Sequence, residues 1–365
     1  MSRERAAIMI EHQARSCASL GSPLYAAVLD RVAHDVREGG PCAGAVAGYE
    51  DAPGPDAIAL RLLGGVHALA LTGRAPELAA HYPSTGGTFD PDRPDACWPA
   101  FRQAVAAETA WVREWMTRPP QTNEVGRANL LITGLLAALQ AAPLPVRLFE
   151  LGASAGLNLR ADHFRYVSEG FAWGPVDSSV VLDGAWQEAP PRWLPGVAQE
   201  HPALTVVERR GCDLTPIDPL SPEGALALRA YLWPDQDARL TRLDGALRLA
   251  AQVPAEVDAL GAAEFLAGIR LVPGTLTVVW HSIMRQYVPG GEWARVEKEL
   301  ERLATAAAPD AGFAYVSFEP RTAGGRHRFR LAVRLGSGPE TILAEAAPHG
   351  LPARDVAARI TAGEG

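Results

Sequence analysis

The sequence predicts an α/β fold, in which a mostly parallel sheet ends in an antiparallel hairpin and follows an all-α N-terminal domain. From Arg147 onward, short apolar runs alternate with helix-length segments, a pattern typical of parallel strands covered by helices on both faces. Residues 1–141 instead carry helical periodicity without strand alternation. We therefore expect a helical N-terminal domain, on the substrate side, over residues 1–141 and an α/β domain over residues 142–365.

Capping residues delimit the helices of the first domain. Ser22 precedes Pro23, which places an N-cap before a proline in the first turn of a helix. Glycines follow several of the periodic segments, as expected at helix ends. Helices are predicted at residues 3–20, 24–37, 56–71, 76–81, 98–116 and 123–141.

Buried strands and one insert make up the second domain. The turn Gly336-Ser337-Gly338-Pro339 separates two strand-like runs and predicts the closing hairpin. Residues 165–203, rich in tryptophan, proline and glycine, are interpreted as an insert. Strands are predicted at residues 146–151, 204–208, 257–260, 275–280, 312–318, 329–335 and 341–346, with a final helix at 352–362.

Composition excludes several classes of function. A net charge of −8 argues against a nucleic-acid partner, which requires a basic surface. No apolar run approaches the roughly 18 residues of a membrane span, and no apolar signal region opens the chain. The four cysteines are scattered, so neither a metal site nor a disulfide framework is indicated. A cytoplasmic location and a small-molecule substrate are expected, and the oligomeric state is left open.

The stretch from Glu150 to Asn158 carries the strongest chemical signal. A buried strand ends at Glu150-Leu151, and the turn Gly152-Ala153-Ser154-Ala155-Gly156 leads into a helix-compatible segment. Glycines in such a turn let a ligand approach the backbone closely. The same five residues match the G-x-S-x-G elbow of serine hydrolases, with Ser154 as nucleophile. A third interpretation is structural, because any strand-to-helix turn can carry small residues.

Polar residues near this turn are candidates for ligand contacts. Asp213, followed by Leu214, comes after the second strand, where nucleotide-binding folds place an acid on ribose hydroxyls; a turn cap is the alternative. Gln121, Asn123 and Arg127 precede an apolar helix that feeds into the first strand. They are expected to form a ligand edge against the turn, although Asn123 also suits a helix N-cap.

His281 is the candidate catalytic base, because it stands at the end of the fourth strand of the expected sheet. A histidine that closes a strand by hydrogen bonding is an equally good interpretation. Tyr287 is a weaker catalytic candidate nearby.

The order of elements favours methyl transfer over hydrolysis. A hydrolase elbow normally follows several strands, whereas the helical residues 1–141 precede this one without an oxyanion loop. Chain order still allows a base at His281, His327 or His349. The residues from Glu150 to Gly156 also match a second pattern, acid-x-Gly-x-Gly-x-Gly, with Ser154 in place of the middle glycine. This pattern is the first motif of class I S-adenosylmethionine-dependent methyltransferases. A serine hydrolase and a non-catalytic nucleoside-binding protein remain the alternatives.

The chain also resembles a bacterial domain-of-unknown-function family with a helical N-terminal half and a class I methyltransferase-like C-terminal half. The resemblance covers nearly the whole chain and rests on Gly21 to Tyr25, Arg61 to Gly64 with His67, Tyr82 to Gly87, Gln121 to Arg127, Glu150 to Asn158, Gly211 to Pro216, Trp233 to Gln236, and His281-Ser282 with Tyr287. It implies a Rossmann-like fold that binds S-adenosylmethionine.

On this resemblance, the strand end and turn would hold the methionine portion of the cofactor, and Glu150 would contact its ammonium group. Asp213 would bind the ribose. One departure concerns the adenine, because relatives often carry Gly-Asp-Ala where this chain has Gly261-Ala262-Ala263. Without that carboxylate, backbone groups must recognise the adenine.

Overall fold

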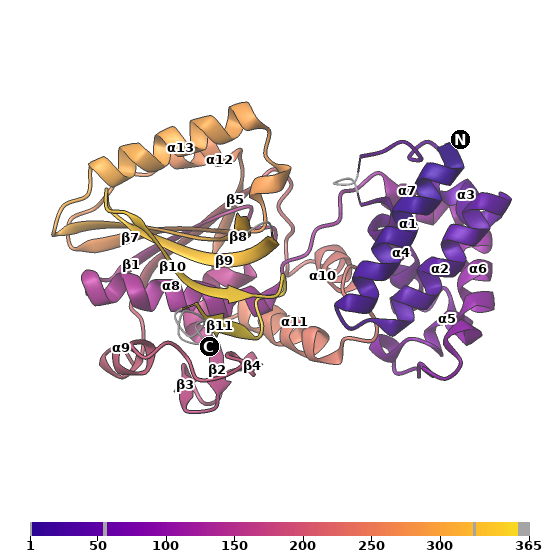
Figure 1. Ribbon diagram of the computed structural model, residues 1–365, viewed down its shortest axis with the longest axis horizontal. Helices are drawn as coiled ribbons and strands as arrows, with labels where there is room; N and C mark the ends of the chain where they lie inside the picture. The colour runs from indigo at the N-terminus through magenta and orange to yellow at the C-terminus, as the bar shows by residue number, and fades with distance from the viewer. Residues whose placement is uncertain (1, 54–56, 324–325, 357–365) are drawn as a thin grey trace, which may run out of the picture. The chain divides into compact units, whose positions relative to one another are not determined.

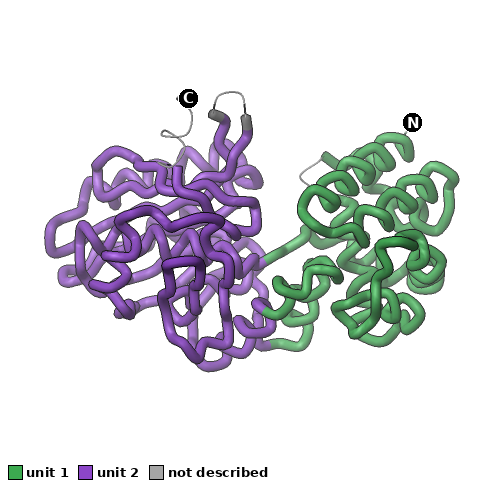
Figure 2. Tube along the Cα trace, turned by 60° about the horizontal axis from the view of Figure 1, so that its bottom comes forward, with its two compact units in different colours: residues 1–122, 221–241 green, residues 123–220, 242–365 purple. Residues whose placement is uncertain are grey.

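The computed structural model describes residues 2–53, 57–323 and 326–356, and the chain divides into two compact units (Figure 2). Unit 1 comprises Met1–Thr122 and Ser221–Thr241, and unit 2 comprises Asn123–Leu220 and Arg242–Gly365. The division differs from the predicted boundary after residue 141. The last predicted helix of the first domain belongs to unit 2, and a later segment of the chain returns to unit 1.

Unit 1 is helical throughout its described residues, as predicted. The expected helix over 98–116 is interrupted at Glu108, and the expected start of another at Asp56 lies outside the described residues. Its helices are α1 (Ser2–Ser19), α2 (Pro23–Glu38), α3 (Pro41–Val46), α4 (Ile58–Leu71), α5 (Pro76–Ala79), α6 (Trp98–Ala107), α7 (Thr109–Met116) and α10 (Pro222–Ala230), with 3-10 turns η2 (Pro83–Thr85) and η3 (Pro94–Cys97).

Asp235 explains why the segment 221–241 belongs to unit 1. Its carboxylate accepts hydrogen bonds from Ser22 Oγ at 2.6 Å and from the backbone N–H of Leu24 at 3.0 Å. These donors lie at the start of α2, where backbone N–H groups lack partners within the helix. Gln236 adds a bond from Nε2 to the carbonyl of Leu20 at 2.9 Å. The returning segment therefore caps a helix formed 200 residues earlier in the chain.

His67, on α4, makes a second connection to the same segment. Its Nδ1 lies 3.2 Å from the carbonyl oxygen of Ala230, and its Nε2 lies 2.7 Å from Ser84 Oγ. The side chain is fully buried, and burial lowers its pKa to about 4. The imidazole is therefore a neutral structural link between α4, η2 and α10.

Unit 2 is built on an eight-stranded sheet of order β11-β10-β9-β8-β7-β1-β5-β6. Pairing is parallel from β6 to β8 and antiparallel from β8 to β11. A large, mostly parallel sheet was predicted and is confirmed. The strands are β1 (Val146–Leu151), β5 (Val206–Asp213), β6 (Glu256–Ala259), β7 (Thr275–Ser282), β8 (Ala311–Ala323), β9 (Arg326–Leu335), β10 (Glu340–Ala346) and β11 (Ala353–Asp355).

The C-terminal strands extend the predicted hairpin. β9 pairs with β10 as expected, and β9 also forms a long antiparallel ladder with β8. The predicted helix over 352–362 is wrong at 353–355, which form β11 against β10; residues 357–362 of that prediction lie outside the described residues.

Helices cover both faces of this sheet (Figure 1). On one face, α12 (Ala262–Gly268) and α13 (Gly290–Thr305) bury apolar side chains of the strands, among them Phe149, Val279 and Phe313. On the other face lies α8 (Ala128–Ala141). A Cβ on Gly134 of α8 would lie only 2.5 Å from Val316, so this helix packs tightly on the sheet. This close packing places α8 in unit 2.

The predicted insert forms a small subdomain of unit 2. Three strands, β2 (Arg165–Ser168), β3 (Phe171–Trp173) and β4 (Val181–Asp183), pair in the order β3-β2-β4, and α9 (Leu194–Glu200) follows. The rings of Tyr166 and Trp173 lie 5.8 Å apart and are buried. These aromatic side chains therefore pack the insert itself. α11 (Asp237–Ala250) continues the chain from unit 1 into unit 2. None of the helices in the described ranges combines the length and apolarity that crossing a membrane requires.

Candidate functional site

The candidate site lies at the carboxyl ends of β1 and β7, at the centre of the sheet. From β1 the chain proceeds to β5 and β6 on one side and then returns to β7 on the other. Ligands of open parallel sheets bind where the connections diverge in this way. A Cβ added to Gly152 would lie 3.0 Å from Met284 Cβ, so the turns that follow the two strands are in contact.

Two residues with a strained backbone lie in the turns after β1 and β7. Ser154, in the turn after β1, has φ +53°, and Ile283, directly after β7, has φ +51°. Non-glycine residues rarely adopt this left-handed conformation, and a β-branched residue such as isoleucine is an outlier there. Strained residues of this kind concentrate at functional sites, where surrounding structure holds them.

The N–H groups of the turn are largely engaged within the protein. Ser154 N–H donates to Asp213 Oδ2 at 2.9 Å, and Leu157 N–H donates to Asn123 Oδ1 at 2.7 Å. Ala153 and Gly156 donate to backbone carbonyls. The following segment is the 3-10 helix η5 (Leu157–His163). These four N–H groups therefore hold the turn in place, and the expected contact between the turn and a ligand stays a prediction.

Within the described part of the chain, three buried polar atoms around the turn have no hydrogen-bond partner: Glu150 Oε2, Ser154 Oγ and Asn158 Oδ1. The other Glu150 oxygen accepts a bond from Trp280 Nε1 at 3.1 Å, and Asn158 Nδ2 donates to the carbonyl of Glu124 at 3.2 Å. Buried polar atoms without partners are rare in proteins and require an explanation. When Glu150 is ionised, two of the three atoms accept hydrogen bonds and the hydroxyl can, so a ligand of the ionised form must bring donors.

Among the described residues, no cation is in contact with Glu150. Burial raises its pKa to about 8, and this effect outweighs the hydrogen bond from Trp280, the positive charge of Arg127 and a weaker interaction with Asn158. Its carboxyl group is therefore mainly protonated at neutral pH. A cation beside it would lower the pKa and restore the carboxylate.

The structure brings several of the predicted ligand residues to this turn. Asn123 contacts it directly, and Arg127 Nη1 lies 3.4 Å from the carbonyl of Ser282 at the end of β7. Asp213 anchors the turn by accepting bonds from Ser154 N–H and, at 3.0 Å, Thr215 N–H, as in the turn-cap interpretation. Leu214 is 79% exposed beside it. Gln121 belongs to unit 1, whereas the turn belongs to unit 2.

His281 lies on the opposite face of the sheet from Glu150. Adjacent strand residues face opposite sides, and Trp280 shares the face of Glu150. His281 instead bonds through Nδ1 to Glu319 Oε1 at 2.8 Å and through Nε2 to Tyr315 Oη at 2.6 Å. Tyr287, in the 3-10 turn η6 (Arg285–Tyr287), is 61% exposed and joins neither group.

Sequence reasoning missed Glu319 and Tyr315. The predicted strand ended at residue 318, whereas β8 continues to Ala323. The missed signal is the alternation of Tyr315, Ser317 and Glu319, which places polar groups on one face of an otherwise apolar strand.

The geometry supplies no base for a serine nucleophile at the turn. Ser154 has the left-handed backbone that a hydrolase elbow requires. Across the described ranges, however, its Oγ has no hydrogen-bond partner, and both nitrogens of His281 are occupied by Glu319 and Tyr315. A nucleophilic serine requires a base within hydrogen-bond reach. The serine hydrolase interpretation therefore has no support from the site geometry.

The chain belongs to the family described as uncharacterized protein conserved in bacteria (DUF2332), whose model matches residues 7–354. No curated protein and no solved structure matches the sequence. Membership of a bacterial family over nearly the whole chain was expected and is confirmed. The family description names neither a reaction nor a ligand.

Proposed function

We propose that unit 2 binds S-adenosylmethionine at the carboxyl ends of β1 and β5 and transfers its methyl group to a small-molecule acceptor. The arrangement of the parallel strands supports this proposal. Numbered along the chain, their order is 3-2-1-4-5, the order of doubly wound nucleotide-binding sheets. The glycine-bearing turn follows the first of these strands, and Asp213 ends the second.

The observation that carries the proposal is the group of buried polar atoms around Glu150 that lack hydrogen-bond partners among the described residues. An ammonium group brings three N–H donors and a positive charge, which are what Glu150 Oε2 and its neighbours lack. A pyrophosphate brings only acceptors and negative charge, so a dinucleotide is disfavoured. Ser154 Oγ and Asn158 Oδ1 would complete the contacts to the amino-acid end of the cofactor.

The remaining contacts would come from the end of β5. A carboxylate accepts up to about four hydrogen bonds, so Asp213 can anchor the turn and also accept from a ribose hydroxyl. Leu214 would offer its exposed side chain to the adenine. Ala262 supplies no side-chain acceptor, and the N–H of Ala263 is bonded to Glu292 at 3.1 Å. Adenine binding would therefore depend on apolar contact.

When bound, the cofactor supplies an electrophilic methyl group. The protein then has to align an acceptor with it and keep water away, and alignment alone accounts for a large part of such rate enhancements. The buried position of Glu150 and Asn158 provides a site from which water is excluded.

Calorimetric titration of the full chain with S-adenosylmethionine and with S-adenosylhomocysteine tests the proposal. Both compounds carry the ammonium group, so both should bind. Glu150→Gln should weaken both at least about tenfold, since it removes a charged hydrogen bond. Glu169→Gln, the same change at an exposed position of unit 2, should leave binding unchanged.

Proton release provides an independent readout. At pH 7 the ammonium should lower the pKa of Glu150 from about 8 and expel its proton, so the observed heat should depend on the ionisation enthalpy of the buffer. Failure of the unmodified protein to bind either compound would overturn the proposal. Binding without methyl transfer to any of a panel of acceptors would reduce it to a nucleoside-binding function.

A further inference from the structure

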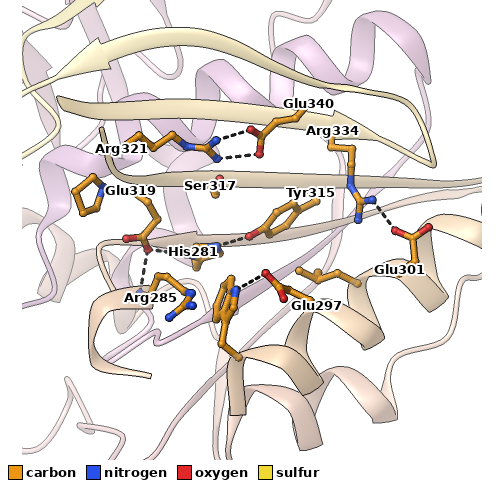
Figure 3. Close-up of a pocket in the computed structure, with 13 residues that line it drawn as sticks. His281, Arg285, Glu297, Glu301, Tyr315, Ser317, Glu319, Arg321, Arg334 and Glu340 are labelled. Atoms are coloured by element: carbon orange, nitrogen blue, oxygen red, sulfur yellow. Dashed lines mark hydrogen bonds and ion pairs between the residues drawn. The ribbon is translucent and has the colours of Figure 1, made fainter. Parts of the chain in front are cut away.

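A cavity of about 440 Å³ lies on the α13 face of the sheet, beside His281 (Figure 3). Its volume falls in the range of small-molecule sites in proteins. α13 contributes Trp293 and Leu300, and the strands contribute Tyr315 and Glu319. Aromatic and aliphatic walls therefore stand next to charged groups, a combination suited to a planar ligand with polar substituents.

Three side chains at one wall form a connected array: Glu319, His281 and Tyr315. Glu319 accepts from His281 Nδ1 and from the backbone N–H groups of Met284, at 2.9 Å, and Arg285, at 3.2 Å. Burial by itself raises the pKa of Glu319, but these hydrogen bonds and the charge that His281 carries when protonated outweigh it, and its pKa lies below the usual value. The group is therefore an ionised carboxylate, which only accepts hydrogen bonds.

The ionised carboxylate determines the roles of the other two groups. His281 Nδ1 must donate to it, so in the neutral imidazole Nε2 is an acceptor. Tyr315 Oη then donates its proton to Nε2 across 2.6 Å. Ser317, on the same face of the strand, also interacts with the Tyr315 hydroxyl, and Oη keeps a lone pair for a donor in the cavity. This arrangement of hydroxyl, imidazole and carboxylate is that of an activated hydroxyl group.

Arg285 is the cation that the cavity offers to a ligand. Arg321 pairs with Glu340, and Arg334 pairs with Glu301. In the parts of the chain that the structure describes, the guanidinium of Arg285 forms no ion pair; it stacks on Trp293 with its central carbon 4.6 Å from the ring centroid. A stacked guanidinium is pre-oriented for a carboxylate.

We propose that this cavity binds a small aromatic acid bearing a hydroxyl group, with the carboxylate on Arg285 and the hydroxyl on Tyr315, and that the array deprotonates that hydroxyl. The ligand proton moves to Tyr315 Oη as the tyrosine proton moves to His281 Nε2. The products are a ligand oxyanion and an imidazolium paired with the Glu319 carboxylate. The ligand loses one proton, His281 gains one, and Tyr315 exchanges its own proton for that of the ligand, so no other reactant is needed.

The cavity lies on the face of the sheet opposite Glu150, and two adjacent residues connect it to the end of β1. Arg285 lines the cavity, and the preceding residue, Met284, contacts the Gly152 turn. An oxyanion formed here is a nucleophile for a methyl group. Identifying the ligand as the methyl acceptor rests on the proposed function, whereas its binding and deprotonation depend on this cavity alone.

Benzoate, 3-hydroxybenzoate and 4-hydroxybenzoate serve as probes, titrated into the full chain without cofactor. At least one hydroxybenzoate should bind about tenfold more tightly than benzoate, because the hydroxyl adds a hydrogen bond to a partly charged array. Tyr315→Phe should reduce its affinity to that of benzoate. Arg285→Gln should weaken all three, and Arg295→Gln, at a mainly exposed position of α13 outside the cavity, should weaken none.

Ultraviolet difference spectra report deprotonation separately from binding. The bound hydroxybenzoate should show the phenolate spectrum with the unmodified protein and the phenol spectrum with Glu319→Gln, in which no carboxylate stabilises the imidazolium. Equal affinity for benzoate and both hydroxybenzoates, absence of binding, or a phenolate signal that survives Glu319→Gln would overturn the inference. Titration of the same preparations with S-adenosylhomocysteine shows independently whether the cofactor proposal fails.

Discussion

His67 in unit 1 and Glu150 in unit 2 are both buried ionisable side chains, but they differ in how completely their polar atoms are hydrogen-bonded. Both nitrogens of His67 lie within hydrogen-bond distance of protein atoms, whereas one oxygen of Glu150 has no partner among the described residues. Burial lowers the pKa of His67 to about 4 and raises that of Glu150 to about 8. Both groups are therefore mainly neutral at pH 7, but only Glu150 has a polar atom that no hydrogen bond reaches.

This difference separates a structural network from a ligand site. Among the described residues of unit 1, the hydroxyls without hydrogen-bond partners include those of Tyr25 and Tyr82, whose rings lie 6.3 Å apart. These hydroxyls are uncharged, and burial raises their pKa values well above 10. At Glu150 the unpartnered atom belongs to a group that a bound cation can ionise. We infer that a buried polar cluster of this chain can serve either purpose, and that the charge and hydrogen bonds of its members distinguish the two.

The largest expected effect is the pH dependence contributed by Glu150. Its pKa rises from 4.5 to about 8 on folding, so the folded protein binds the extra proton between these values. Stability is then fully present below pH 4.5 and is lost as pH approaches 8, by roughly 4 kcal/mol. Hydrogen exchange of unit 2 peptides across this range should show that fall, and Glu150→Gln should lack it. Glu169→Gln, at an exposed position, serves as control and should behave like the parent. If stability falls with pH equally in the parent and in Glu150→Gln, the proton taken up on folding does not belong to Glu150.

His67 should give unit 1 the opposite dependence. Its pKa falls from 6.5 to about 4 on folding, so the unfolded chain binds the extra proton in that interval. Stability is present above pH 6.5 and is lost as pH falls to 4, by roughly 3 kcal/mol. Hydrogen exchange of unit 1 peptides should report the loss, and His67→Gln should show less of it. His34→Gln, at an exposed position of α2, should leave the pH dependence of unit 1 stability unaltered. If His67→Gln shows the same pH dependence as the parent protein, His67 does not cause it.

The smallest effect concerns backbone strain at the turn. Ser154→Gly should raise the free energy of unfolding by less than about 1 kcal/mol, because relief of the left-handed conformation slightly exceeds the entropy cost of glycine. Urea denaturation measures the change. Ser154→Ala keeps the strain and removes only the hydroxyl, so it should not be stabilised by the same mechanism. A loss of more than about 1 kcal/mol in the glycine variant would show that the Ser154 side chain holds the turn.

Local patterns predicted the elements of this protein well. The apolar run before Glu150 and the small residues after it predicted a strand and a turn, because both depend on residue types within a few positions. The same reasoning missed that the segment 221–241 belongs to unit 1. That membership depends on Asp235 meeting Ser22, and no local pattern encodes a contact across such a separation.

The sequence by itself determined the order of strands and helices, the mostly parallel sheet and the position of the glycine-bearing turn, since periodicity and turn residues act over short range. Only the tertiary structure decided which polar atoms lack partners and that His281 faces Tyr315 and Glu319 on the other side of the sheet from Glu150. Burial and hydrogen bonding depend on side chains that the fold brings together from distant parts of the chain, and for that reason the chemistry of the site could not be derived from its motif alone.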